Sequence, residues 1–274
     1  RSKGLNKDDV PINELRGECR KFAKDWVNIQ GKEFKRLGII GDWENPYLTM
    51  DFSSEAVIAE EFMKFMMNGS LYQGSKPVMW SPVEKTALAE AEIEYREHKS
   101  PTIWVKFTIP TGALAGANVV IWTTTPWTIP SNKAVAYNKS ISYGLYKVLK
   151  TKEECWSKVD ELLIFADKLA TECLVQARVT DYERVSTISL NELKGLHLQH
   201  PLHGVAGSRG FWDYDVPMID GEHVTEDAGT GFVHTAPSHG ADDYEAFVNL
   251  GWTNRMNHNI NEDSSFSDNV PFFS

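Results

Sequence analysis

The hydrophobic period of this chain changes near residues 98–101, from helical before that point to strand-like after it, and this limits the possible folds. Apolar residues that recur at steps of four and three predict one face of a helix. They are Leu15, Cys19, Phe22, Trp26 and Ile29. After the turn-rich stretch "GDWENPY", a second helix is predicted from about Ser53 to Asn68-Gly69, where the glycine provides a stop. Its apolar residues are predicted to pack in a core: Ile58, Phe62, Phe65 and Met66.

Beyond residue 101, apolar and polar side chains alternate as in half-buried strands. The first strand is predicted at 103–109, with Ile103, Val105 and Phe107 on one face. Further strands are predicted at 118–124, 133–137, 143–149, 178–189, 216–219 and 230–235. One helix, at roughly 160–174, interrupts them. Many short strands with turn signals and few helices indicate a β-barrel-like domain.

The predicted fold class is therefore α+β: a β-barrel domain of mixed strands with helical decoration, preceded by a helical linking segment. We assign residues 1–99 to the helical segment, 100–250 to the barrel and 251–274 to a polar, turn-rich segment. The chain of 274 residues is long enough for a sizeable core, and its 42% hydrophobic and 24% charged residues are typical of globular proteins.

Composition also excludes several classes of protein. No apolar run approaches the roughly 20 residues needed to cross a bilayer, and the N-terminal stretch has no apolar signal core. The three cysteines are far apart and odd in number, which favours reduced thiols and a cytoplasmic location. The net charge of −10 argues against binding nucleic acid mainly by bulk electrostatics, although a local basic groove stays possible.

Two dense segments carry the candidate functional residues. The first, "NVVIWTTTPWTIPSN", begins as a buried strand and ends in Thr123, Thr124 and Thr125, followed by a turn stiffened by Pro126 and Pro130. Hydroxyls on a rigid strand end can donate hydrogen bonds to a ligand and can line a pocket without filling it. The alternative interpretation of each threonine is simple β-propensity.

The second segment, "EDAGTGFVHTAPSHGADDYEAF", combines histidines with paired carboxylates. Asp242 and Asp243 are predicted at a helix start, where an acidic residue also stabilises the helix dipole. His234, at a strand end, is equally consistent with a structural histidine. Together with His239 these residues suit a zinc-dependent hydrolase, although their spacing matches none of the helical zinc motifs. No nucleophile elbow, P-loop or dinucleotide fingerprint is present.

The motifs "WTTTPWTIPSN" and "GTGFVHTAPSHGADDY" closely resemble the editing domain of isoleucyl-tRNA synthetase, the insertion called connective peptide 1. The resemblance extends through "FKRLGIIGDWENPYLTM" and "KPVMWSPVEKTALAEAEIEY", and so covers nearly the whole chain. The valine and leucine enzymes typically have an arginine after two threonines, then proline and an acidic residue. Here Thr125 and Trp127 stand at the arginine and acid positions, which favours the isoleucine branch.

Two features of this family are missing from the sequence. The HIGH-type and KMSKS-type signatures for ATP and the adenylate do not occur, so we expect an excised fragment that cannot activate an amino acid. Many relatives also carry a Cys-x-x-Cys pair where this chain has Ser81 and Glu84, and a zinc knuckle is therefore not expected there.

The resemblance implies post-transfer editing, the hydrolysis of valine esterified to the 3′-terminal adenosine of isoleucine tRNA. Asp243 would hold the α-ammonium and His234 would exclude the larger side chain. The candidate catalytic residues are Asp243, His234, Thr124 and Thr125. The candidate substrate-binding residues are Thr123, Trp127, Thr128, Asn132, His239 and Asp242. A ribose hydroxyl would help to orient the water.

We expect no cofactor and no metal, no membrane, and a monomer whose partners are the acceptor end of tRNA(Ile) carrying valine and the rest of the synthetase chain. Two alternatives stay open. One is a catalytically inactive module that binds the tRNA acceptor end, and the other is a metal-dependent hydrolase.

Overall fold

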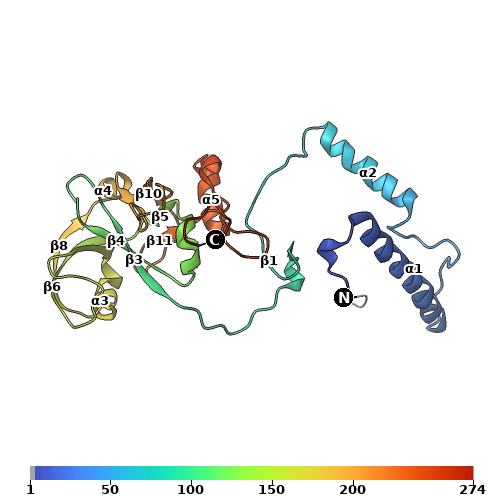
Figure 1. Cartoon of the computed structure of the whole chain (residues 1–274), viewed down its shortest axis with the longest axis horizontal. Coiled ribbons are helices and arrows are strands. Elements are labelled where there is room, and N and C mark those ends of the chain that lie inside the picture. The colour runs from blue at the N-terminus through green and yellow to red at the C-terminus, as the bar shows by residue number, and fades with distance from the viewer. Residues whose placement is uncertain (1–3, 274) are drawn as a thin grey trace. The chain divides into compact units, whose positions relative to one another are not determined.

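The computed structural model describes residues 4–273, and the chain divides into two compact units, the first ending at Gly74 and the second beginning at Ser75 (Figure 1). None of the helices in this part of the chain is both long and apolar enough to cross a membrane. Whether the functional segments have the boundaries at 99 and 250 stays a prediction, since the division at residue 74 reports compactness alone.

The first unit is a pair of helices. After the short 3-10 helix η1 (Lys7–Asp9), helix α1 spans Ile12–Arg36 and α2 spans Phe52–Met67, so both predicted helices are confirmed. Arg20 of α1 connects the two, because its guanidinium donates to the Met50 carbonyl and the Glu55 carboxylate and lies 4.8 Å above the Phe52 ring.

The prediction that the apolar residues of α2 pack in a core is wrong for this structure. Ile58, Phe62, Phe65 and Met66 are 53–57% exposed. The physical reason is that α1 meets α2 mainly near the start of α2, through Arg20, and leaves this apolar face uncovered.

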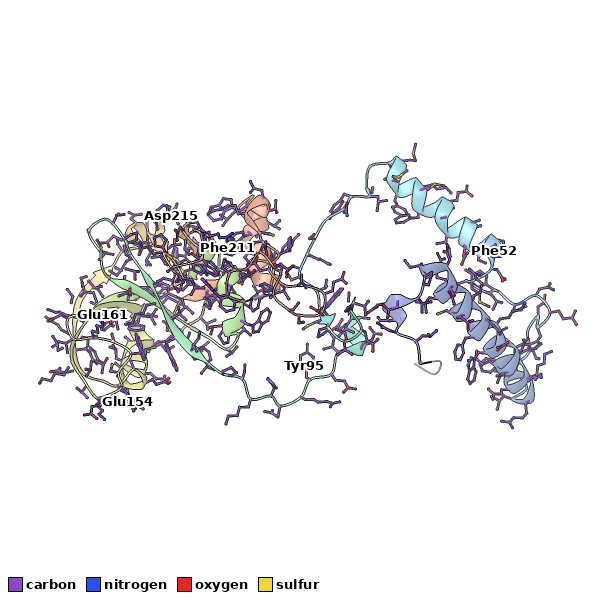
Figure 2. The ribbon with its side chains drawn as sticks, in the orientation of Figure 1. Phe52, Tyr95, Glu154, Glu161, Phe211 and Asp215 are labelled. Atoms are coloured by element: carbon purple, nitrogen blue, oxygen red, sulfur yellow. The ribbon has the colours of Figure 1, made fainter. Side chains whose placement is uncertain are left out.

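The second unit contains a small hairpin and two larger sheets. The hairpin pairs β1 (Trp80–Ser81) with β2 (Thr86–Ala87) and is followed by η2 (Glu90–Glu92). An extended stretch that includes Tyr95 leads from there to the first long strand (Figure 2). The five-stranded sheet has the order β3-β4-β7-β6-β8. Its strands are β3 (Ile103–Thr108), β4 (Asn118–Thr123), β6 (Tyr143–Thr151), β7 (Leu162–Ala166) and β8 (Val179–Ile188).

The four-stranded sheet has the order β11-β5-β10-β9. Its strands are β5 (Ala134–Tyr137), β9 (His197–Gln199), β10 (Asp215–Asp220) and β11 (Val233–Thr235). The remaining elements of this unit are η3 (Pro126–Ser131), α3 (Asp167–Gln176), α4 (Leu190–Lys194), α5 (Ala241–Asn249) and η4 (Thr253–Arg255). Short β9 and α4 were not predicted, because three to five residues give no readable period.

The predicted class of helices with mixed strands is confirmed, but the predicted barrel is not found: apart from the β1-β2 hairpin, the strands of the described residues form two open sheets rather than one closed ladder. The chain leaves the five-stranded sheet at Thr123 and enters the other at Ala134. Between them lies η3, whose Pro126 and Pro130 lack the N–H groups that a continuing ladder requires.

The helix predicted at 160–174 is correct only in its second half. Leu162–Ala166 form the strand β7, which pairs with both β4 and β6, and α3 begins at Asp167. This run is apolar throughout, and a short continuous apolar run fits a doubly covered strand as well as a buried helix. Only the two neighbouring strands decide between them.

The core lies in the second unit and connects the two sheets. Val120, Leu163 and Phe165 of the five-stranded sheet and Val135 of the four-stranded sheet are fully buried members of one cluster. The rings of Tyr143 and Phe232 stack at 4.6 Å, and the Tyr143 hydroxyl donates to the Gly231 carbonyl. The turn before β11 is thereby fixed against the other sheet.

A substitution of Gly231, in this turn, tests how closely the turn before β11 approaches the end of β7. Its φ is +82°, and a Cβ atom there would collide with the Cβ of Ala166 at the end of β7. We expect Gly231→Ala to lower the free energy of unfolding by about 3 kcal/mol or more, from left-handed backbone strain and the clash together. Chemical denaturation measures this loss.

Gly116 provides the matched control, since its φ is +85° and a Cβ atom there would have open space. Gly116→Ala should therefore show the backbone term alone, about 1 kcal/mol. Equal losses in the two variants would contradict a close approach at Gly231.

Candidate functional site

Both dense sequence segments meet at one half-open cavity of about 150 Å³ in the second unit. Its lining comes from the end of β4, from η3, from β11 and from the first turn of α5. The lining residues are Trp122, Thr123, Thr125, Thr128, Val233, His234, Ala236, His239 and Asp243. A cavity of about 150 Å³ accepts a molecule the size of benzene, so this one suits a single small side chain.

The first threonine ends β4 by turning the chain. Thr123 Oγ1 accepts the N–H of Thr125 at 3.1 Å and lies 3.3 Å from Thr125 Oγ1. Pro126 then occupies the first position of η3, where its fixed φ suits a helix start and its missing N–H is not needed. The strand end and the proline together direct Thr125 and Thr128 to the cavity.

His234 is buried and both of its ring nitrogens have protein partners. Nε2 lies 2.7 Å from Thr128 Oγ1, and Nδ1 lies 2.8 Å from Asn132 Nδ2. The Thr128 hydroxyl donates its proton to the Thr125 carbonyl and so must accept from Nε2. The Asn132 amide donates to the Ala134 carbonyl through the same Nδ2, which assigns this nitrogen also as the donor to Nδ1.

The neighbours of His234 therefore assign one neutral tautomer, protonated at Nε2. Burial, with smaller contributions from His200 and His239, lowers its pKa to about 3. A second proton on Nδ1 would face the Asn132 amide donor, which explains why the cationic form is unfavourable here. At neutral pH His234 can form a wall of the cavity, but it has no free nitrogen for proton transfer or metal binding.

Asp243 supplies the carboxylate of the cavity. It lies in the first turn of α5, and its Oδ2 accepts the Ala236 N–H at 2.8 Å, which connects the helix to the end of β11. Burial raises the pKa of this carboxyl, partly opposed by the hydrogen bond from Ala236 and by His223. A cation bound beside it would favour the ionised form.

His239, which lines the cavity, contacts Trp127 beside it. The two rings meet edge to face at 5.0 Å, and His239 Nε2 lies 3.3 Å from Ser131 Oγ. Burial, with a smaller contribution from His258, lowers the pKa of His239. Trp127 is 49% exposed and is not part of the lining. It offers an open aromatic face next to the cavity.

Three further candidates also lie outside the lining. Thr124 is exposed, and its carbonyl accepts the Ser100 hydroxyl. Asp242 is exposed on α5. Asn132 is fully buried behind His234, where its Oδ1 has no hydrogen-bond partner among the described residues. The two sequence motifs thus include most of the residues at the site. The structure shows which of them line the cavity and which lie behind or beside it.

Three lining residues were not predicted as site residues: Trp122, Val233 and Ala236. All three lie inside the quoted motifs, but apolar side chains in strands usually indicate packing. The signal available was their position directly beside Thr123, His234 and the proline turn. Within residues 4–273, no group of three or more His, Cys, Asp or Glu side chains is arranged to hold a metal ion.

Comparison with known proteins places the chain in a family. Residues 2–212 match the family model of tRNA synthetases class I (I, L, M and V). The chain therefore belongs to the class I tRNA synthetases. Within that family it is similar to isoleucine–tRNA ligases: it is 55% identical to that of Ruegeria pomeroyi over 277 residues, and 57% identical to that of Bartonella quintana over 248 residues.

These matches cover 100% and 89% of this chain but only 28% and 25% of the two ligases. Among solved structures, the chain is similar to GlLeuRS-CP1 (TM-score 0.42, 18% identity, 57% of this chain and 62% of that one). It is also similar to the P. knowlesi cytosolic leucyl-tRNA synthetase editing domain (TM-score 0.43, 12% identity, 59% and 67%). The family assignment rests on the sequence match rather than on these structures.

The lowered pKa of His234 predicts an acid-sensitive fold. Between pH 6.5 and about 3, His234 is protonated in the unfolded chain but stays neutral in the folded chain. The free energy of unfolding therefore falls as the pH falls through this range. At pH 5 His234 alone should lower the free energy of unfolding by about 2 kcal/mol relative to pH 8. Urea denaturation at both pH values measures the difference.

Other groups act on the same curve. His200, with a pKa lowered to about 4, His239, whose pKa is also lowered, and Asp167, with a pKa lowered to about 2, add to the acid loss, and Asp243, whose pKa is raised, opposes it. His234→Gln should therefore remove only its own part of the difference, whereas His197→Gln, at an exposed position of β9, should leave it intact. If the free energy of unfolding of His234→Gln depends on pH as that of the unchanged chain does, the lowered pKa of His234 is contradicted.

Proposed function

We propose that this chain is an editing domain that hydrolyses the aminoacyl ester of mischarged Val-tRNA(Ile). The observation that carries the proposal is the cavity itself, which is lined together by the half-buried carboxylate of Asp243, the hydroxyl-bearing Thr123 and Thr125, and His234. The similarity to isoleucine–tRNA ligases supports it. A site of this kind must hold an amino group, exclude one extra methylene and place water against an ester.

Asp243 binds the α-ammonium of the esterified amino acid in this proposal. A carboxylate and an ammonium form a charge-assisted hydrogen bond, which fixes both position and direction. Since Oδ2 is already held by the Ala236 N–H, the carboxylate cannot turn freely, and the bound amino acid takes one orientation.

His234 acts as the steric wall that excludes isoleucine. A hydrophobic pocket alone discriminates poorly between side chains that differ by one methylene, so a second site that admits only the smaller product is an effective solution. The role of His234 here is exclusion rather than proton transfer, because its ring nitrogens bind Thr128 and Asn132 and its pKa is about 3.

The hydrolysis itself needs a positioned water. Its oxygen adds to the ester carbonyl carbon, the bond from that carbon to the ribose oxygen breaks, and the ribose oxygen takes up a proton. A neighbouring ribose hydroxyl orients the water. Thr125 lies at the cavity with an exposed side chain and is the threonine best placed to donate to the developing oxyanion, whereas the Thr128 hydroxyl is already bound to the Thr125 carbonyl.

The residues beside the cavity have secondary roles in this proposal. Trp127 and His239 contact the terminal adenosine, and Thr124 contacts ribose from its exposed position. Asn132 acts through His234, and Asp242 contributes negative charge at the start of α5.

The partners proposed for the chain are the acceptor end of tRNA(Ile) and the remainder of a synthetase. The apolar face of α2, with Phe62 and Met66 more than half exposed, is suited to being covered by such a remainder. The described chain spans 28% of its Ruegeria relative, which leaves ample protein to do so. Cytoplasmic location and a monomeric state stay predictions.

Asp243→Ala should abolish valine release, at least a hundredfold, because the α-ammonium loses its counter-charge, while the circular dichroism spectrum stays native. The assay follows labelled valine released from Val-tRNA(Ile). Asp242→Ala, one residue away on the exposed side of α5, is the matched control and should retain most activity. Retained hydrolysis in a folded Asp243→Ala protein would remove Asp243 from the mechanism.

His234→Ala should let the domain hydrolyse Ile-tRNA(Ile) as well, since removing the imidazole enlarges the cavity by more than one methylene. The measurement is the ratio of valine to isoleucine release, which should fall by about tenfold or more. A mutant that still spares Ile-tRNA(Ile) would show that another residue is the sieve.

Two other functions are tested by the same assay performed with EDTA. Release of valine alone in the presence of EDTA supports editing and contradicts a metal-dependent hydrolase. Loss of release with chelator, restored by zinc, would establish that hydrolase instead. Binding of the tRNA acceptor end without any release would indicate the inactive module.

A further inference from the structure

We propose that Trp212, Tyr214 and Asn259 are positioning residues that hold η3, the loop of the editing cavity, by hydrogen bonds to its polar atoms. None of the three lines the cavity. The inference rests on the proposed function and deepens it, because it assigns the discrimination between valine and isoleucine partly to residues behind the cavity wall.

The loop needs such partners because its polar main-chain atoms are buried. Residues 128–132 are buried, and two of the loop's residues, Pro126 and Pro130, have no N–H. Main-chain bonds from Thr128 N to the Thr125 carbonyl and from Asn132 N to the Ile129 carbonyl close the two ends of η3. The carbonyls of Pro130 and Asn132 are then buried acceptors that require donors from elsewhere.

Side chains from distant segments provide these donors. Trp212 Nε1 donates to the Pro130 carbonyl at 3.0 Å, and the Tyr214 hydroxyl donates to the Asn132 carbonyl at 2.5 Å. Asn259 Nδ2 donates to Ser131 Oγ at 3.0 Å and more weakly to the Pro130 carbonyl at 3.4 Å.

A fourth donor strengthens the same arrangement. His200 Nε2 lies 3.0 Å from the Ile129 carbonyl, while its Nδ1 accepts the Leu202 N–H, so the ring is a neutral donor toward the loop. The carbonyls of Ile129, Pro130 and Asn132 thus each accept a hydrogen bond from a side chain outside the loop, and these bonds fix the direction in which the carbonyls point.

The Trp212 and Tyr214 side chains are themselves packed against neighbouring residues. Trp212 is fully buried and stacks on His200 at 6.0 Å with an interplanar angle of 14°, and Phe211 packs against it edge to face at 5.0 Å. Lys133 Nζ lies 3.9 Å above the Tyr214 ring. Trp212 and Tyr214 lie in sequence between Phe211 and Asp215, which are labelled in Figure 2. Asp215 is the first residue of β10, so these two donors directly precede a strand of the four-stranded sheet.

The position of the loop decides the position of the cavity wall. Thr128, inside η3, binds His234 Nε2, and Asn132, at its end, binds His234 Nδ1. A shift of the Pro130 or Asn132 carbonyl therefore moves both neighbours of the proposed sieve. Since exclusion of one methylene depends on small displacements of a wall, loss of these donors should relax discrimination before it abolishes tRNA binding.

Tyr214→Phe tests this inference with little change in volume, since only the hydroxyl is removed. The matched control is Tyr146→Phe, which removes the hydroxyl that donates to Asp167 Oδ1 at 2.6 Å in the five-stranded sheet. In the whole chain, Tyr214→Phe should lower the ratio of valine to isoleucine release by about five- to tenfold, mostly through kcat, with KM for tRNA unchanged. Tyr146→Phe should leave the ratio intact. Asn259→Ala should shift the ratio in the same direction as Tyr214→Phe.

Amide hydrogen exchange gives a readout that does not need activity. The Thr128 and Asn132 amides, which close the two turns of η3, should exchange faster in Tyr214→Phe than in Tyr146→Phe. Equal exchange in both variants, or an unchanged ratio in an active protein, would overturn the inference and leave Tyr214 a structural residue. Absence of valine release from the unchanged chain would instead contradict the proposed function, and the exchange data would still decide whether Tyr214 holds the loop.

Discussion

The hydrogen-bond chain through His234 is the constraint on which the site depends. It runs from the Asn132 amide to Nδ1, across the ring to Nε2, and on to the Thr128 hydroxyl and the Thr125 carbonyl. Asn132 Nδ2 can only donate and the Thr128 hydroxyl proton is taken by the Thr125 carbonyl, so the direction of the whole chain is set. Because the chain joins β11 to η3, the four-stranded sheet and the threonine loop cannot move independently, and the cavity keeps one shape.

The two sheets take up their positions around this connection. The five-stranded sheet delivers Thr123 at the end of β4, and the four-stranded sheet delivers His234 on β11. The proline-stiffened loop η3 lies between β4 and β5, where the chain passes from one sheet to the other, and its Thr128 lines the cavity.

The ionisable groups at the cavity are one carboxylate and neutral histidines. Asp243 is a carboxylate near the cavity whose burial raises its pKa, and the adjacent histidines are held neutral by burial. In the proposed function, an incoming ammonium would meet the Asp243 carboxylate without competition from imidazolium. The net charge of −10 does not oppose this proposal, since such recognition of an amino acid would be local.

The two helices of the first unit, most strands of the second and the two motifs that form the cavity could be predicted from the sequence, because hydrophobic period and turn residues are local properties. The sequence did not determine that 162–166 is a strand, that the apolar face of α2 is exposed, or that the sheets stay open, since each depends on which neighbour covers a face. Nor could it separate lining residues such as Thr125 from supporting ones such as Asn132. That distinction appears in the folded chain alone, because side chains a hundred residues apart in sequence complete each other's hydrogen bonds.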